Sequence, residues 1–340
     1  MKRYDFPKLD LHLHLDGAIS VNTIFELAKE RGIKLPSNNP EGLVPYVTAD
    51  ADISDVNEYL KKFEIPTAVL QDKPALRRAA REAVINLGEQ GVRYAEIRFA
   101  PQLHTKKFLK QPDAIDAVLE GISEGKMESD NVDIGLILCA MSFGDASLNK
   151  KENLETVRLA SELKGKGIDG IDLAGAECLC PLSDFSYIFE EAKDLNLSYT
   201  CHAGDSDGPE SVRTAILDFG ARRIGHGHRI IEDTELCRLA AGLGVTLEIC
   251  LTSNIQCKTQ ASYETHPAKR LMDMGIKVTL NTDNPVIAGV TLDSEYDFAV
   301  LQGGFSMNDL IRANINSVEA SFMPPNLKNK LLEELSGKIK

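Results

Sequence analysis

Short apolar runs recur along the chain, and most are followed by a segment in which apolar residues have helical spacing. Eight runs have the length of β-strands and are apolar almost throughout, which is typical of strands buried on both faces of a parallel sheet. They lie at residues 8–15, 92–100, 133–140, 168–174, 197–202, 222–226, 245–250 and 277–282. Strands that alternate with helices predict a (β/α)₈ TIM-type barrel, with a doubly wound open sheet as the alternative.

The stretch between the first two predicted strands is too long for one crossover helix. Residues 17–91 show helical spacing at 21–31, 54–63 and 74–90. We therefore expect a helical insertion after the first strand that lies over the mouth of the barrel as a lid. Extra C-terminal helices are expected at 308–322 and 326–336. No linker or repeat beyond the strand–helix unit is present, which predicts one domain over residues 1–340.

Histidines and an aspartate occupy the predicted strand ends, where barrel enzymes place their catalytic groups. His12 and His14 end the first strand, and alternation puts both on one side. His202, His226 and Asp283 follow at the ends of the fifth, sixth and eighth strands. Three neutral imidazoles and one carboxylate, with a place left for water, form a typical catalytic zinc site. The fourth strand lacks the lysine with which two-metal barrel hydrolases often bridge their ions, which favours a single metal.

The other histidines, His104, His228 and His266, are predicted to be structural because they follow loops or begin helices. The seven cysteines form no Cys-x-x-Cys pair, so we expect them to be reduced and mostly buried.

Composition narrows the possible partners. Lys and Arg total 38 against 51 Asp and Glu, a net charge of −13, which argues against nucleic acid and anionic membrane surfaces as partners. No apolar run approaches the length of a membrane span, and no apolar signal-peptide segment follows Met1, so a cytoplasmic protein is expected. With 43% hydrophobic and 26% charged residues, the chain is an ordinary globular one.

Six motifs, in order over nearly the whole chain, extend this picture. They are KLDLHLHLDG at 8–17, EIRFAPQL at 96–103, DLAG at 172–175, HAG at 202–204, RIGHG at 223–227 and LNTD at 280–283. Together they resemble the adenosine deaminase family of the metal-dependent hydrolase superfamily.

The resemblance implies a role for each matching residue. One Zn²⁺ per chain would be held by His12, His14, His202 and Asp283. His226 would position and activate the attacking water, and Asp205 would share a proton with purine N1.

The resemblance also implies the substrate contacts. The backbone N–H of Gly175 would meet purine N3, Asp16 would bind a ribose hydroxyl, and Asn284 would donate to N7. Val56, Tyr59, Leu60 and Phe63 share one helix face and resemble the apolar lid of the family; the same spacing is typical of an ordinary helix core.

Three positions depart from the family pattern. Asp205 stands where the family usually has glutamate, Asn284 where it often has aspartate, and Ser142 where many members have arginine. The leading hypothesis is zinc-dependent deamination of adenosine and 2′-deoxyadenosine to inosine and 2′-deoxyinosine, with release of ammonia, in purine salvage. Asp16 favours a nucleoside, and no basic cluster favours a 5′-phosphate. The alternatives are a deaminase of another aminopurine or modified adenosine, and a nucleoside-binding homologue that has lost turnover because the Asp205 side chain is shorter.

Overall fold

In the part of the chain that the structure describes, eight parallel strands form the centre of the molecule. The computed structural model describes residues 4–49, 53–129 and 131–339. The strands are β1 (Lys8–His14), β2 (Val92–Phe99), β3 (Asp133–Ser142), β4 (Ile168–Gly175), β5 (Cys201–Ala203), β6 (Arg223–His226), β7 (Thr246–Ile249) and β8 (Lys277–Leu280). They pair in the sequence orders β1-β2-β3-β4 and β5-β6-β7-β8.

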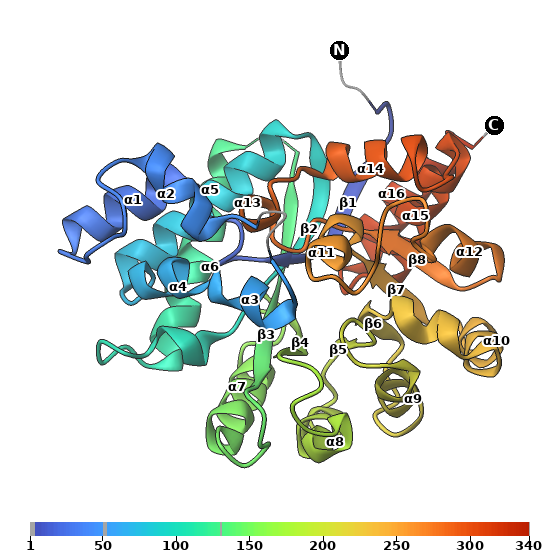
Figure 1. The fold of residues 1–340 in the computed structure, drawn as a ribbon, viewed down its shortest axis with the longest axis horizontal. Coiled ribbons are helices and arrows are strands. Elements are labelled where there is room, and N and C mark those ends of the chain that lie inside the picture. The colour runs from blue at the N-terminus through green and yellow to red at the C-terminus, as the bar shows by residue number, and fades with distance from the viewer. Residues whose placement is uncertain (1–3, 50–52, 130, 340) are drawn as a thin grey trace.

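These two sets of four strands meet at two seams. Ile171 of β4 bridges Tyr199 just before β5, and Leu13 of β1 bridges Asp283 just after β8. At the second seam the His14 N–H donates to the Asp283 carbonyl and the Asp283 N–H donates to the His12 carbonyl, each at 2.8 Å. The architecture is therefore the TIM-type barrel that the strand pattern predicts, and the open-sheet alternative is wrong. Figure 1 shows helices surrounding the strands.

The helices that follow β2 and the later strands account for most of the outer layer. They are α6 (Gln111–Glu128), α7 (Lys150–Glu162), α8 (Ser186–Asp194), α9 (Pro209–Leu217), α10 (Thr234–Gly242), α11 (Leu251–Gln256), α12 (Ala268–Asp273), α13 (Pro285–Ala288) and α14 (Leu292–Leu301). Two C-terminal helices, α15 (Met307–Ala320) and α16 (Pro325–Ser336), match the extra helices expected from the sequence.

Alternation along β1 divides its side chains between two environments. Leu9 and Leu11 pack outward with Ile311 and Val318 of α15. His12 and His14, on the other side of the strand, contact Glu248 and Asp283 inside the barrel. One strand thus anchors the C-terminal helices and carries the first histidines of the site.

The described residues between β1 and β2, which leave out 50–52, form five helices rather than the three that spacing predicts. They are α1 (Val21–Glu30), α2 (Pro40–Val47), α3 (Val56–Lys61), α4 (Glu64–Val69) and α5 (Lys73–Glu89). Pro45 lies inside α2 and Pro66 inside α4. Proline is a sequence signal for a helix stop, which explains why these two short helices are not predicted.

The fifth strand is also shorter than the predicted 197–202. Its pairing with β6 begins at Cys201, whereas the residues just before it pair with β4. The Ile171 N–H donates to the Ser198 carbonyl and the Thr200 N–H donates to the Ile171 carbonyl, both at 3.0 Å.

All seven cysteines are free, and five of them are buried, as the sequence predicts. Within the described ranges, no helix combines the length and the apolar content that crossing a membrane requires.

A glycine on α6 allows that helix to pack closely against α5. A Cβ added at Gly121 would lie 2.2 Å from the Arg77 carbonyl oxygen and 2.9 Å from the Ala80 Cβ. Gly121→Ala would push the helices apart, and we expect it to lower the free energy of unfolding by about 1–3 kcal/mol. Gly242→Ala is the control, because a Cβ there meets nothing within 4 Å and alanine is favoured in helices by up to about 1 kcal/mol. Denaturant unfolding measures both; equal stabilities would contradict the packing argument.

Candidate active site

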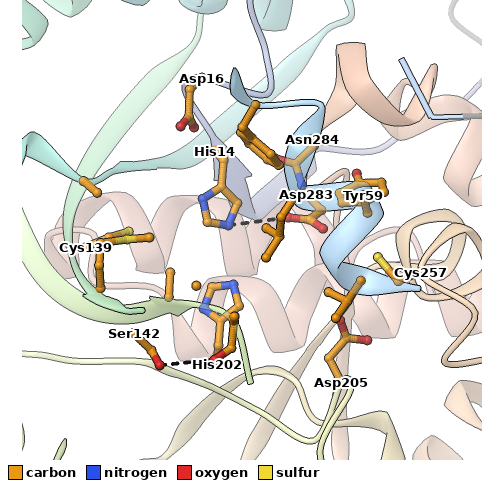
Figure 2. Close-up of a pocket in the computed structure, with 18 of the residues that line it drawn as sticks. His14, Asp16, Tyr59, Cys139, Ser142, His202, Asp205, Cys257, Asp283 and Asn284 are labelled. Carbon is orange, nitrogen blue, oxygen red and sulfur yellow. Dashed lines mark hydrogen bonds and ion pairs between the residues drawn. The ribbon is translucent and has the colours of Figure 1, made fainter. Parts of the chain in front are cut away.

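A cavity of about 400 Å³ opens at the C-terminal ends of the strands. This volume lies within the range of small-molecule sites. Figure 2 shows its lining, with side chains from several strand ends facing one another. Eight of the nine site residues predicted from the sequence line it: His14, Asp16, Gly175, His202, Asp205, His226, Asp283 and Asn284. The ninth, His12, is fully buried beside them.

Side chains that could hold a metal ion converge on one side of the cavity. The Nε2 atoms of His12 and His14 each lie 3.5 Å from Asp283 Oδ1. Two overlapping groups bring their ligand atoms within 4.8 Å of one another: His12 with His14 and His202, and His12 with His226 and Asp283. The strand ends therefore assemble all five side chains that the sequence analysis brought together.

Two carboxylates behind the histidines hold their rings in place. Glu248 Oε2 lies 2.9 Å from His12 Nδ1, and Asp172 Oδ2 lies 2.9 Å from His202 Nδ1. His12 Nε2 is left buried with no hydrogen-bond partner. A metal-ligating histidine characteristically gives its other ring N–H to a carboxylate, and three imidazoles with one carboxylate suit Zn²⁺. The residues present therefore fit a metal ion.

Two buried arginines neutralise these carboxylates inside the barrel. Arg98 lies 2.8 Å from both Asp172 and Glu248, and Arg223 contacts Glu248 and Glu96, each at 2.6 Å. Burial alone would raise the pKa of Glu248, but Arg223 and Arg98 hold it well below its usual range. In the same way His202 and Arg98 overcome the effect of burial and lower the pKa of Asp172. Both groups are therefore carboxylates, so each places a negative charge against an imidazole ring.

Asp205 lies at the edge of the cavity within a polar cluster. Its Oδ1 accepts hydrogen bonds from Asn254 Nδ2 at 2.8 Å and Thr259 Oγ1 at 2.9 Å. Burial opposes ionisation, but His226 and His228 outweigh it and lower the pKa of Asp205. Asp205 is therefore a carboxylate in the free protein.

A second carboxyl group holds the Asp205 loop. Glu177 Oε2 accepts the backbone N–H groups of Asp205 at 3.1 Å and Asp207 at 2.7 Å. Burial and the charge of Asp205 raise the pKa of Glu177. These two hydrogen bonds fix the backbone at Asp205, and with it the point from which its short side chain extends.

Backbone strain is stored at two of the site residues. His226 and Asp283 have φ values of +60° and +58°, in the left-handed region that side chains other than glycine seldom adopt. Ser253 Oγ donates to Asp283 Oδ2 at 2.6 Å, which orients the carboxylate further. Strain of this kind clusters at functional sites, where the surrounding structure enforces it.

The three residues that the resemblance assigns to substrate all face the cavity. Burial raises the pKa of Asp16 to about 6. Gly175 has φ +116°, and a Cβ there would lie 2.4 Å from the Ser142 carbonyl oxygen. Asn284 packs so closely on Gly17 that a Cβ on that glycine would lie 2.2 Å from Asn284 Oδ1. A side chain at Gly175 or at Gly17 would collide with these neighbours, so the cavity keeps its shape only with glycine at both positions.

One face of α3 closes the cavity opposite the strand ends. The lining side chains are those expected from the spacing: Val56, Tyr59 and Leu60 of α3, and Phe63 just beyond its end. Tyr59 is buried, and Figure 2 places it beside Asn284 and Asp283.

Sequence reasoning missed several residues of the site. Glu248 and Arg98 lie within predicted apolar strands, and a charge in such a strand is the signal that could have found them. His104 bonds to the Leu70 carbonyl, in agreement with a structural role. His228 and His266, also predicted to be structural, lie beside the site: His228 Nδ1 is 3.8 Å from Asp205 Oδ1, and His266 Nε2 is 3.1 Å from Asn254 Oδ1.

Comparison with known proteins identifies the family. The sequence profile of the adenosine deaminase family matches residues 7–338. The chain belongs to the adenosine deaminase family. The adenosine deaminase of Haemophilus ducreyi is 39% identical over 330 residues, which are 96% of this chain and 95% of that protein. The chain is therefore an aminohydrolase enzyme.

Solved structures of other deaminases are similar over almost their whole length. The adenine deaminase of Arthrobacter aurescens has a TM-score of 0.87 at 27% identity, covering 97% of this chain and 98% of that one. The N6-methyl-AMP deaminase of Arabidopsis thaliana has a TM-score of 0.81 at 26% identity, covering 98% and 97%. These relatives are named for different substrates, so the purine must be argued from the cavity.

The carboxylates behind the histidines predict a test of metal affinity. Asp172→Asn keeps the side-chain shape but removes the charge that faces His202 and Arg98. We expect the affinity for Zn²⁺ to fall about 10- to 100-fold. Asp194→Asn, at the exposed end of α8, is the control and should leave the affinity unchanged. Competition with a chromophoric chelator measures both affinities, and a wild-type value for Asp172→Asn would show that this carboxylate does not support the site.

Proposed function

We propose that this enzyme deaminates adenosine and 2′-deoxyadenosine by hydrolysis, yielding inosine or 2′-deoxyinosine and ammonia. The observation that carries the proposal is the convergence of His12, His14, His202 and Asp283 beside Asp205 in one cavity. These four ligands would hold one Zn²⁺, which as a Lewis acid lowers the pKa of water and so supplies a nucleophile at neutral pH.

The side chains around the metal site divide the remaining work. Asp283 and His226 would hold the attacking water against purine C6. Asp205 is a carboxylate in the free protein and takes up a proton as the purine binds, so that it can share that proton with N1 when negative charge develops on the ring. On the other ring edges, the Gly175 N–H meets N3 and the Asn284 amide donates to N7.

The sugar end of the cavity favours a nucleoside over a nucleotide. Asp16 lines the cavity and would accept a hydrogen bond from a ribose hydroxyl. Among the described residues that line the cavity there is no lysine or arginine, and a buried phosphate needs such a partner. Asp16 would also repel a phosphate. We infer that α3 covers the sugar and base as a lid, which excludes bulk water from the reaction.

One observation favours a second candidate. Asp205 is one methylene shorter than the glutamate at this position of the family, so its carboxyl lies roughly 1.5 Å farther back. A misplacement of about 1 Å can cost on the order of 100-fold in rate. The second candidate is therefore a deaminase of another aminopurine, or a nucleoside-binding homologue without turnover.

A substrate panel tests the proposed specificity. We expect the zinc-loaded enzyme to convert adenosine and 2′-deoxyadenosine, followed by the ultraviolet change to inosine, with bound metal quantified in the same sample. AMP and N6-methyl-AMP should react at least about 100-fold less efficiently in kcat/KM, because their phosphate would be buried without a cation. Efficient turnover of a 5′-phosphate would contradict the nucleoside assignment. Binding of adenosine without turnover would support the second candidate.

Substitution of Asp205 tests its role as the acid. Asp205→Ala should lower kcat about 10²- to 10⁴-fold with the metal retained, which is the range for loss of a positioned general acid. Asp218→Ala, exposed just after α9, should have no effect. Asp205→Glu separates two accounts: a large gain means that the native acid is too short for adenosine, and a loss means that the pocket is adapted to aspartate. If Asp205→Ala keeps the parent rate, Asp205 is not the acid.

A further inference from the structure

A chain of hydrogen bonds reaches the site from the start of α12. The Ala268 backbone N–H donates to His266 Nδ1 at 3.2 Å. A backbone N–H can only donate, so Nδ1 is the unprotonated nitrogen of this ring. Burial lowers the pKa of His266 well below its usual range and keeps the imidazole neutral. Its one ring proton is therefore on Nε2.

That proton sets the orientation of a buried amide. His266 Nε2 lies 3.1 Å from Asn254 Oδ1, so the N–H donates to the amide oxygen. The Asn254 side chain, which is fully buried, must then turn its NH₂ group the other way. Orientations of amides and imidazoles have to be inferred from such networks, and here a main-chain donor fixes the whole series.

The NH₂ group of Asn254 meets both groups assigned to catalysis. It donates to Asp205 Oδ1 at 2.8 Å, and His226 Nδ1 lies 3.0 Å from the same nitrogen. An amide nitrogen has two protons and no lone pair to offer, so His226 Nδ1 must be the acceptor. The proton of the neutral His226 ring is then on Nε2, the nitrogen that does not contact Asn254.

We propose that Asn254, oriented by His266, is a positioning residue that fixes His226 in the tautomer protonated at Nε2 and aims the Asp205 carboxylate. Resting on the proposed function, this gives His226 a definite part in the reaction. Neutral His226 holds the attacking water by donating a hydrogen bond and takes no proton from it. The acceptor left beside the water is a carboxylate, Asp283.

The test is ¹⁵N NMR of the zinc-loaded enzyme without substrate, with the ring signals of His226 assigned by their absence in His226→Gln. We expect a protonated-type Nε2 and an unprotonated Nδ1. A proton on Nδ1 would overturn the proposal, whatever the enzyme deaminates. If the protein shows the expected ¹⁵N pattern but does not convert adenosine, the proposed function is contradicted and the proposal about Asn254 is not.

Variants separate positioning from mere structural support. In Asn254→Asp a carboxylate replaces the NH₂ donor, so His226 should move its proton to Nδ1 or gain a second one, and kcat should fall on the order of 100-fold. His266→Gln, whose amide can still donate to Asn254, should keep the wild-type ¹⁵N pattern. Gln256→Ala is the control on α11, since its amide bonds to the Ala288 carbonyl instead. If Asn254→Asp unfolds, the wild-type spectrum still decides; if it folds with the ¹⁵N pattern unchanged, the proposal is wrong.

Discussion

The site depends on a cluster of buried charges inside the barrel. Arg98 and Arg223 face Glu96, Asp172 and Glu248, all buried. Two positive and three negative charges leave one negative charge in excess. With Asp283 the excess becomes two, which a divalent cation would balance. A buried charge without a partner is strongly destabilising, so this cluster favours both the closed barrel and a metal ion above it.

The same cluster links the core to the chemistry. Glu248 Oε2 and Asp172 Oδ2 face the rings of His12 and His202 with the same oxygens that accept hydrogen bonds from Arg98. The arginines keep these carboxylates ionised, and the carboxylates keep the rings turned toward the metal site. Polar cores of this kind specify one arrangement because each group is costly to leave unpaired. In our proposal Asn254 positions Asp205 and His226, just as Glu248 and Asp172 position the rings of His12 and His202.

Local patterns were enough to predict the barrel and to bring the site residues together. A strand places alternate residues on one side, and parallel strands end at one face, so chain-local rules bring His12, His14, His202, His226 and Asp283 together. The choice of ligands among them comes from the resemblance to the family. Their roles stay predictions. What local rules could not reach is the partners: Asp172 meets His202, and Glu248 meets His12 from 236 residues away in the chain. His266 is predicted to be structural because it precedes Pro267 at a helix start, and that pattern does not reveal its contact with Asn254. The prolines in α2 and α4 are the reason that these two helices are not predicted.

Anomalous diffraction at the zinc edge, from crystals of the zinc-loaded enzyme, tests the central claim most directly. The account predicts one peak per chain, bounded by His12, His14, His202 and Asp283. Two peaks, no peak, or one peak away from these side chains would contradict it.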